Sequence, residues 1–134
     1  MAFQIKEDKP ARTVRVICTD EVSVEDFMDY LRDYWIGPHN LGYHHLVDFR
    51  QAIITLEFGE ILKLVSHAAP TMDSNYSNAR TALIVADEDQ FELCEFFKHA
   101  RHQICNPFIR EVGVFYDIGA AERWVSAVMP AIAS

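Results

Sequence analysis

The sequence predicts an α/β fold in which helices connect the strands of a mostly parallel sheet. Three observations support this prediction: strand-like and helix-like periodicities alternate four times, the connections between them are short, and half of the residues are hydrophobic. Such an order forms parallel strand pairs joined by right-handed crossovers. A chain of 134 residues suits one domain with its own core, and we take 1–134 as that domain.

The first unit is a strand over 13–19 followed by a helix that begins at Ser23. The strand is rich in β-branched residues, and a weaker pattern over 3–7 predicts an antiparallel hairpin arm. Ser23 is a suitable N-cap, and Asp26 follows at the spacing of a capping box. The predicted inner face of the helix consists of Val24, Phe27, Met28, Leu31, Tyr34 and Trp35.

Three further strand–helix units follow. The stretch "HLVDF" predicts a strand, with a helix that begins near Thr55. The stretch "RTALIVAD" is apolar on both faces, which is typical of a central strand, and Asp87 with Gln90 predicts the next helix start. "REVGVFYD" predicts the last strand, after which Asp117 caps a helix that ends before Pro130. The predicted inner faces of these helices are Phe58, Ile61, Leu62, Val65 and Ala69; Leu93, Phe97, Ala100 and Ile104; and Ala121, Trp124, Val125 and Val128.

Composition argues against several functional classes. The chain has 12 Lys and Arg against 20 Asp and Glu, a net charge of −8, which repels nucleic acid. Its apolar runs are shorter than the ~20 residues of a membrane span, and the first residues lack the apolar stretch of a signal peptide. Three cysteines without a CxxC pair argue against a disulfide framework. We therefore expect a cytoplasmic location.

Three aspartates fall at or after predicted strands: Asp48, Asp87 and Asp117. Ligands often bind where parallel strands end, and grouped carboxylates suit divalent cations, so an enzyme that uses this acidic rim is one hypothesis. The structural alternative is an ion pair between Asp48 and Arg50, with Asp87 and Asp117 as helix N-caps. We favour the structural alternative and predict no metal site.

The histidines form no convincing metal site. His99, His102 and Cys105 are spaced three apart near a helix end, but zinc needs a further ligand in fixed geometry. Histidines at such an end also interact with the helix dipole and its free carbonyls. His44 and His45 point to opposite faces of a strand, so the two do not share one ligand.

No catalytic residue is predicted. Nucleophilic catalysis needs a Ser or Cys beside a base, and we interpret Cys18 and Cys94 as small core residues. The sequence contains no GxSxG, P-loop or GxGxxG motif. We therefore expect a protein that is not an enzyme and has no cofactor.

The stretches "VRVICTDEVSVEDFMDYL", "HLVDFR", "RTALIVAD" and "VGVFYDIGAAERWV" together resemble the SpoIIAA-like family, relatives of the STAS domain of anti-sigma-factor antagonists. The likeness spans roughly residues 12–126. It implies a STAS-like βα superhelix with the helices mainly on one face of the sheet. It also implies a non-catalytic regulatory or protein-interaction role.

The resemblance also points to the connection after the second parallel strand. In the sporulation antagonists this turn carries an aspartate followed by serines, one of which the partner kinase phosphorylates. Here the matching stretch is "ITLEFGE", without serine or an Asp-Ser pair. Thr55 as a phosphate acceptor and Glu57 as a permanent charge are the switch interpretations. We expect instead that Thr55 is an N-cap and Glu57 a first-turn carboxylate.

Two binding hypotheses involve the aromatic residues. Tyr34 and Trp35 belong to types enriched at binding surfaces, and a sheet face without helices needs cover, so we expect a protein partner and a homodimer. The alternative is an apolar pocket beneath the first two helices that binds a small apolar or lipid-like ligand, including one at a membrane surface, with Phe27, Met28, Tyr34, Trp35 and Phe58 as its lining. The acidic charge argues against docking to anionic lipid.

Overall fold

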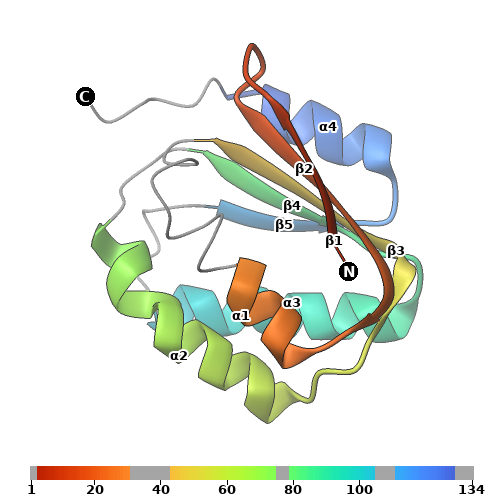
Figure 1. The fold of residues 1–134 in the computed structure, drawn as a ribbon. Helices are drawn as coiled ribbons and strands as arrows, with labels where there is room; N and C mark the ends of the chain where they lie inside the picture. The colour runs from red at the N-terminus through yellow and green to blue at the C-terminus, as the bar shows by residue number, and fades with distance from the viewer. Residues whose placement is uncertain (1–2, 31–42, 75–78, 105–110, 129–134) are drawn as a thin grey trace.

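The computed structural model describes residues 3–30, 43–74, 79–104 and 111–128 of the chain. In these ranges the elements, in chain order, are β1 (Phe3–Asp8), β2 (Thr13–Val22), α1 (Val24–Tyr30), β3 (His44–Ile54), α2 (Phe58–Ser74), β4 (Arg80–Ile84), α3 (Glu88–Ile104), β5 (Glu111–Phe115) and α4 (Ile118–Ser126). The strands form one sheet in the order β1-β2-β3-β4-β5 (Figure 1).

The sheet has the predicted mostly parallel topology. β1 pairs antiparallel with β2, while β2, β3, β4 and β5 run parallel to one another. Each parallel neighbour follows in chain order, as expected when every strand is followed by a crossover. The α/β prediction and the antiparallel hairpin arm are both confirmed.

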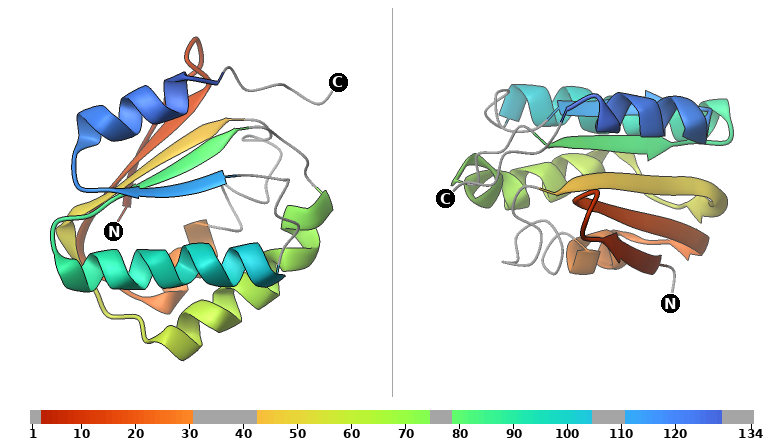
Figure 2. Two further views of the ribbon diagram at one scale, coloured as in Figure 1. Left: turned by 180° about the vertical axis from the view of Figure 1, so that it is seen from behind. Right: turned by 90° about the horizontal axis from the view of Figure 1, so that it is seen from above.

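Helices cover both faces of the sheet unequally. α1, α2 and α3 lie on one side and α4 on the other (Figures 1 and 2). β4 contributes to both layers, because Leu83 joins the core on the α1–α3 side while Ala82 and Ile84 pack with Ala121 and Val125 of α4. β4 is therefore the central, doubly covered strand that its sequence predicts.

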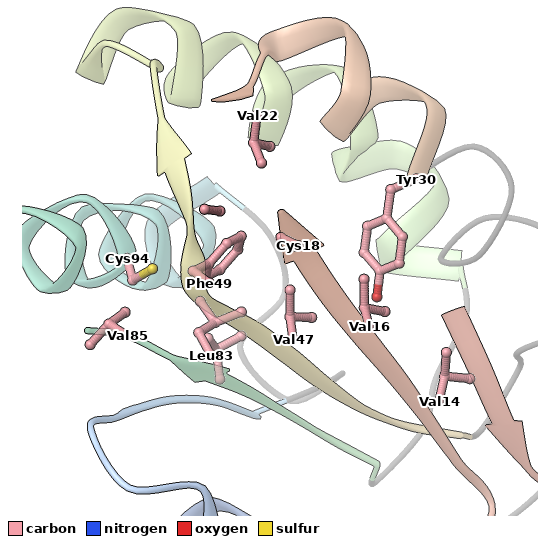
Figure 3. Packing of buried hydrophobic residues seen from close by; sticks show 12 residues of the cluster. Val14, Val16, Cys18, Val22, Tyr30, Val47, Phe49, Leu83, Val85 and Cys94 are labelled. Carbon is pink, nitrogen blue, oxygen red and sulfur yellow. The ribbon is translucent and has the colours of Figure 1, made fainter. Parts of the chain in front are cut away.

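The main core lies between the sheet and helices α1–α3. Figure 3 shows residues of this core that come from α1 (Tyr30), β2 (Val14, Val16 and Val22), β3 (Phe49) and α3 (Cys94). Tyr30 stacks edge-on against Phe3 at a centroid distance of 5.7 Å, so the β1 arm also covers this core. A smaller cluster joins α2 to α3 through Ile61, Val65 and Ala100, among others.

β3 is longer than predicted, and α2 starts later. The parallel pairing of β2 with β3 shifts between Ile17↔Asp48 and Thr19↔Gln51, so β3 carries one extra residue, a bulge. Pairing then resumes and extends β3 to Ile54, and α2 begins at Phe58 instead of near Thr55.

Some predicted inner-face residues lie outside. Phe58 and Leu62 are 49% and 42% exposed, and Ile104 is 40% exposed. The inner face of α2 is instead Ile61, Leu64 and Val65, all buried, so the helix is rotated relative to the prediction. The predicted stripes of α3 and α4 are otherwise inward, with Ala100, Ala121 and Val125 buried. Leu31, Tyr34 and Trp35 lie outside the described residues.

Candidate functional site

Asp48 forms an ion pair with Arg50. One carboxylate oxygen accepts hydrogen bonds from the Arg50 main-chain N–H and Nε, both at 3.0 Å, and the other accepts from Nη2 at 2.8 Å. Such a two-pronged pair is the stronger geometry for arginine and carboxylate. Asp48 lies within β3, before the bulge, and does not end the strand as predicted. The expected ion pair is confirmed.

The negative charge of Asp48 is balanced by the positive charge of Arg50. Partial burial acts to raise the pKa of Asp48, but the hydrogen bonds from Arg50 outweigh it and hold the pKa below its usual value. The pKa of Arg50 is raised, first by its hydrogen bond to Asp48 and also, as a smaller effect, by the charge of Asp117. Arg50 therefore supplies positive charge beside two of the three candidate carboxylates.

Asp87 and Asp117 are helix N-caps. The Asp87 carboxylate accepts from the Gln90 N–H at 2.9 Å, and that of Asp117 accepts from the Ala120 N–H at 3.0 Å. Each bond stabilises the first turn of the helix that its aspartate caps. Among the described residues no group of three His, Cys, Asp or Glu side chains is placed to hold a metal ion.

Gln90 has a larger structural role than its predicted part in a cap. Its side-chain oxygen accepts from Ala86 N–H at 2.9 Å, and its amide nitrogen donates to the carbonyls of Phe49 and Ala52 at 3.0 and 2.8 Å. Those carbonyls flank the β3 bulge. Gln90, which is buried, thus replaces main-chain bonds that the bulge interrupts.

Thr55 and Glu57 do not have the predicted capping roles. Thr55 Oγ1 donates to the carbonyl of Val22 at 3.1 Å, and its N–H donates to the same oxygen at 3.2 Å. Thr55 therefore joins the end of β3 to the end of β2, three residues before α2 begins. Glu57 precedes α2, and its N–H donates to Glu60 Oε1 at 3.0 Å. The first-turn carboxylate is thus Glu60.

His44 and His45 lie on opposite faces of β3, whereas His99 and His102 lie on α3. His44 Nε2 donates to the Val128 carbonyl at 2.7 Å, while its Nδ1 accepts from the Arg80 N–H at 2.9 Å. His45 points to the other face, where its Nδ1 is hydrogen-bonded to Tyr30 Oη. His99 is exposed and lies 3.5 Å from Glu95, and His102 is also exposed. Cys105 lies outside the described residues.

The two described cysteines are buried in the main core. Burial raises the pKa of the Cys18 thiol, and it raises the pKa of Cys94 to about 12. A thiol with such a pKa stays protonated at neutral pH and is a poor nucleophile. The interpretation of both residues as core cysteines is confirmed.

An apolar surface at the start of α2 was missed by the sequence-based interpretation. Phe58 and Leu62 are four residues apart and therefore lie on one side of the helix. The Phe58 ring contacts Phe96 of α3 at a centroid distance of 4.7 Å. We call Phe58, Leu62 and Phe96 the α2 stripe. Phe58 and Leu62 were assigned to the inner face because α2 has apolar residues on more than one side.

A small apolar cavity lies between the sheet and helices α1, α2 and α3. Its volume is about 60 Å³, and it is lined by Phe27, Tyr30, Val47, Phe49, Ile54, Leu56, Ile61, Leu64, Leu83, Leu93, Cys94 and Phe97. Of the five residues predicted to line a pocket, Phe27 does so. Phe58 lies on the surface, Met28 packs against the smaller cluster, and Tyr34 and Trp35 are outside the described residues.

Comparison with known proteins identifies the fold. No protein-family model matches the sequence, and no curated protein is similar to it. A solved structure, an uncharacterised protein of the DUF3478 family with a SpoIIAA-like fold from Shewanella loihica PV-4, is similar over 92% of both chains, with a TM-score of 0.53 and 17% identity. In the described part of the chain no helix has the length and apolar character needed to cross a membrane. The chain has a SpoIIAA-like fold, as its sequence pattern predicted.

Proposed function

We propose that the chain is a non-catalytic regulatory domain that binds a protein partner through the α2 stripe. The observation that carries the proposal is the exposure of Phe58 and Leu62 on one side of α2. Phe96 continues this surface onto α3, so the apolar side chains form a patch. Exposed apolar patches mark interaction sites, and aromatic anchors contribute strongly to binding.

The chemistry of the remaining candidates supports a non-catalytic role. Asp48 is engaged by Arg50, while Asp87 and Asp117 cap helices. The thiols of Cys18 and Cys94 are buried. These groups stabilise the fold through contacts that a reaction would have to break.

The position of the stripe agrees with the resemblance to anti-sigma-factor antagonists. In those proteins the regulated serine precedes the equivalent helix, and here Glu57 directly precedes Phe58. Because the connection contains no serine, control by phosphorylation at that place is not part of the proposal. We propose constitutive binding in the cytoplasm.

A second copy of the chain is the first partner that we propose. In a two-fold dimer the same patch meets itself, so two stripes would cover each other. α4 already packs over the opposite face of β3, β4 and β5. We therefore propose the α2 stripe, and not the sheet face that α4 covers, as the dimer interface.

Light scattering at micromolar concentration tests this proposal with three variants. We expect a dimer for the wild type and a monomer for Phe58→Asp and Leu62→Asp, because a buried carboxylate opposes stripe contact. Lys63→Asp, at an exposed position one residue further round the helix, should remain a dimer. A monomeric wild type would refute the homodimer, and dimers in all variants would refute the stripe as its interface.

We infer from the cavity a second candidate function, the binding of an apolar molecule smaller than benzene. Its volume of about 60 Å³ is below the ~150 Å³ that accommodates benzene in an engineered cavity, so a whole acyl chain would not fit this conformation. Aliphatic and aromatic side chains form most of the lining, and the Tyr30 hydroxyl is hydrogen-bonded to His45. The cavity thus offers dispersion contacts more than polar recognition.

Cys94→Leu tests this second function, because the larger side chain fills the cavity. If the cavity is empty in solution, we expect the variant to be more stable by about 1 kcal/mol. If a ligand occupies it, native mass spectrometry of the wild type should detect a bound small molecule that the variant lacks. A wild type without any bound molecule, together with a stabilised variant, would reject ligand binding.

A further inference from the structure

The outer edge of β5 is a candidate binding surface separate from the α2 stripe. β5 is an edge strand of the sheet and, among the described strands, pairs with β4 alone. The Val85 N–H donates to the Phe115 carbonyl at 2.8 Å, so the main-chain groups of Phe115 turn toward β4. Because this direction alternates along a strand, the N–H and C=O groups of Val112 and Val114 turn outward.

A groove of about 670 Å³ runs along this edge. β5 lies between α3 and α4 at the near side of the sheet (Figure 2, left). On the α4 side Phe115 contacts Trp124 at a centroid distance of 5.4 Å, while the α3 side presents Lys98 and His102. A strand placed beside β5 would direct alternate side chains to these two walls.

The side of the groove formed by α3 carries the positive charge of Lys98, although the net charge of the protein is −8. Of the two acids of the groove, Glu111 is paired with Arg80 at 3.6 Å, while Glu95 lies 3.5 Å from His99, which adds positive charge only when it is protonated. Lys98 has no carboxylate within ion-pair distance among the described residues. The groove therefore favours an acidic ligand.

The opposite edge of the sheet differs in character. β1 presents Lys6, Glu7 and Asp8, all exposed, and charges on an edge strand oppose the addition of another strand. These residues form the C-terminal half of β1, whereas the three central residues of β5 are Val112, Gly113 and Val114. The two edges are thus distinguished by sequence, and β5 is the one suited to strand pairing.

We propose that the β5 edge binds an extended segment of a partner protein as an additional strand. The main chain of that segment bonds to Val112 and Val114, its acidic side chains face Lys98, and its apolar side chains face Trp124. A second copy of the chain fits less well as the partner. Two-fold pairing of β5 with itself would bring the Lys98 side chains of the two copies together, and their like charges would repel. The β5 edge is thus a second binding surface, formed by residues that do not belong to the α2 stripe.

A labelled hexapeptide that alternates Glu and Val, measured by fluorescence anisotropy, tests the proposal against the same peptide with Lys in place of Glu. Val114→Pro removes one outward N–H and no bond to β4, so we expect binding of the Glu peptide to weaken about five- to tenfold. Lys98→Glu should reverse the preference between the two peptides. Lys6→Glu, the same charge reversal on the β1 edge, should leave both affinities unchanged.

Several results would overturn the proposal. These are absence of binding to the wild type, equal binding of both peptides, and a wild-type dimer that Val114→Pro dissociates, which would make a second copy the occupant. If Val114→Pro does not fold, Lys98→Glu still tests the proposal, because an unchanged preference between the two peptides would overturn it. Phe58→Asp should leave peptide binding unchanged, so failure of the β5 edge and failure of the α2 stripe are distinguishable.

Discussion

Single side chains at the ends of the strands are committed to structure. Residue types allowed us to predict the Asp87 and Asp117 caps and the Asp48–Arg50 pair, because each depends on neighbours two or three positions away. The bonds from Gln90 to Phe49 and Ala52 join residues 41 and 38 positions apart. The two carbonyls flank the β3 bulge, and nothing in the sequence marks that bulge.

Asp48→Asn should weaken the fold at pH 7 by about 1 kcal/mol, since one partner is half exposed and screened by water. The folded-state pKa of Asp48 is lowered, so its contribution is present above the unfolded-state value of about 3.9 and is lost as pH falls through the folded-state value. Urea unfolding of wild type and variant should therefore give a stability difference that narrows below about pH 4. A difference independent of pH would contradict the ion-pair assignment.

Gln90→Ala should cost roughly 2–3 kcal/mol, because it leaves buried carbonyls of Phe49 and Ala52 without donors. Asp87→Ala, which removes only the cap of the same helix, should cost about 1 kcal/mol. Denaturant unfolding of both variants measures the comparison. Equal losses would show that Gln90 acts as no more than part of the cap.

The buried thiols should be unreactive in the folded protein. The pKa of Cys94 is raised to about 12 and that of Cys18 is also raised, so almost no thiolate forms at pH 8. In a Cys105→Ser variant, a thiol reagent such as DTNB should react only after denaturant is added. Rapid reaction of either thiol under native conditions would show that the core opens easily.

Helices and strands were predicted where local sequence determines them. The Ser23–Asp26 capping box is present, with Asp26 N–H donating to Ser23 Oγ at 3.3 Å and Ser23 N–H to Asp26 Oδ2 at 3.0 Å. The start of α2 was wrong because it depends on the bonds of Thr55 to Val22, 33 positions away. The predicted orientation of α2 about its axis was wrong because apolar residues lie on more than one side of its first turns.

The two glycines of β5 and α2 should respond oppositely to alanine. A Cβ at Gly113 would lie 2.8 Å from a ring atom of Phe115 and 3.2 Å from Trp124, so Gly113→Ala should destabilise by about 1–3 kcal/mol through overpacking. Gly59 has no atom within 4 Å of such a Cβ. Gly59→Ala, in the first turn of α2, should stabilise by about 0.5 kcal/mol. Thermal unfolding measures both changes, and destabilisation at both sites would contradict this packing.

The mostly parallel sheet could be predicted for the whole molecule because alternating units permit few topologies. The placement of the helices mainly on one face was implied by the resemblance to the SpoIIAA-like family. An apolar pocket beneath the first two helices was one hypothesis, but most of the cavity lining and the exposed stripe could not be predicted, since both depend on how α1, α2 and α3 fit together over the sheet. A periodic pattern identifies an apolar side chain but does not decide whether a neighbouring element covers it. Phe58 and Leu62 are such cases, and they are the residues on which the proposed function depends.

Site-specific photo-cross-linking tests the proposed function most directly. A photoreactive phenylalanine analogue replaces Leu62 in one protein and, as a matched control, the adjacent exposed Lys63 in another. We predict that position 62 forms a discrete covalent adduct with a second polypeptide, at twice the chain mass for a homodimer, and that position 63 forms much less. Adducts at neither position, or equally at both, would contradict binding through the α2 stripe.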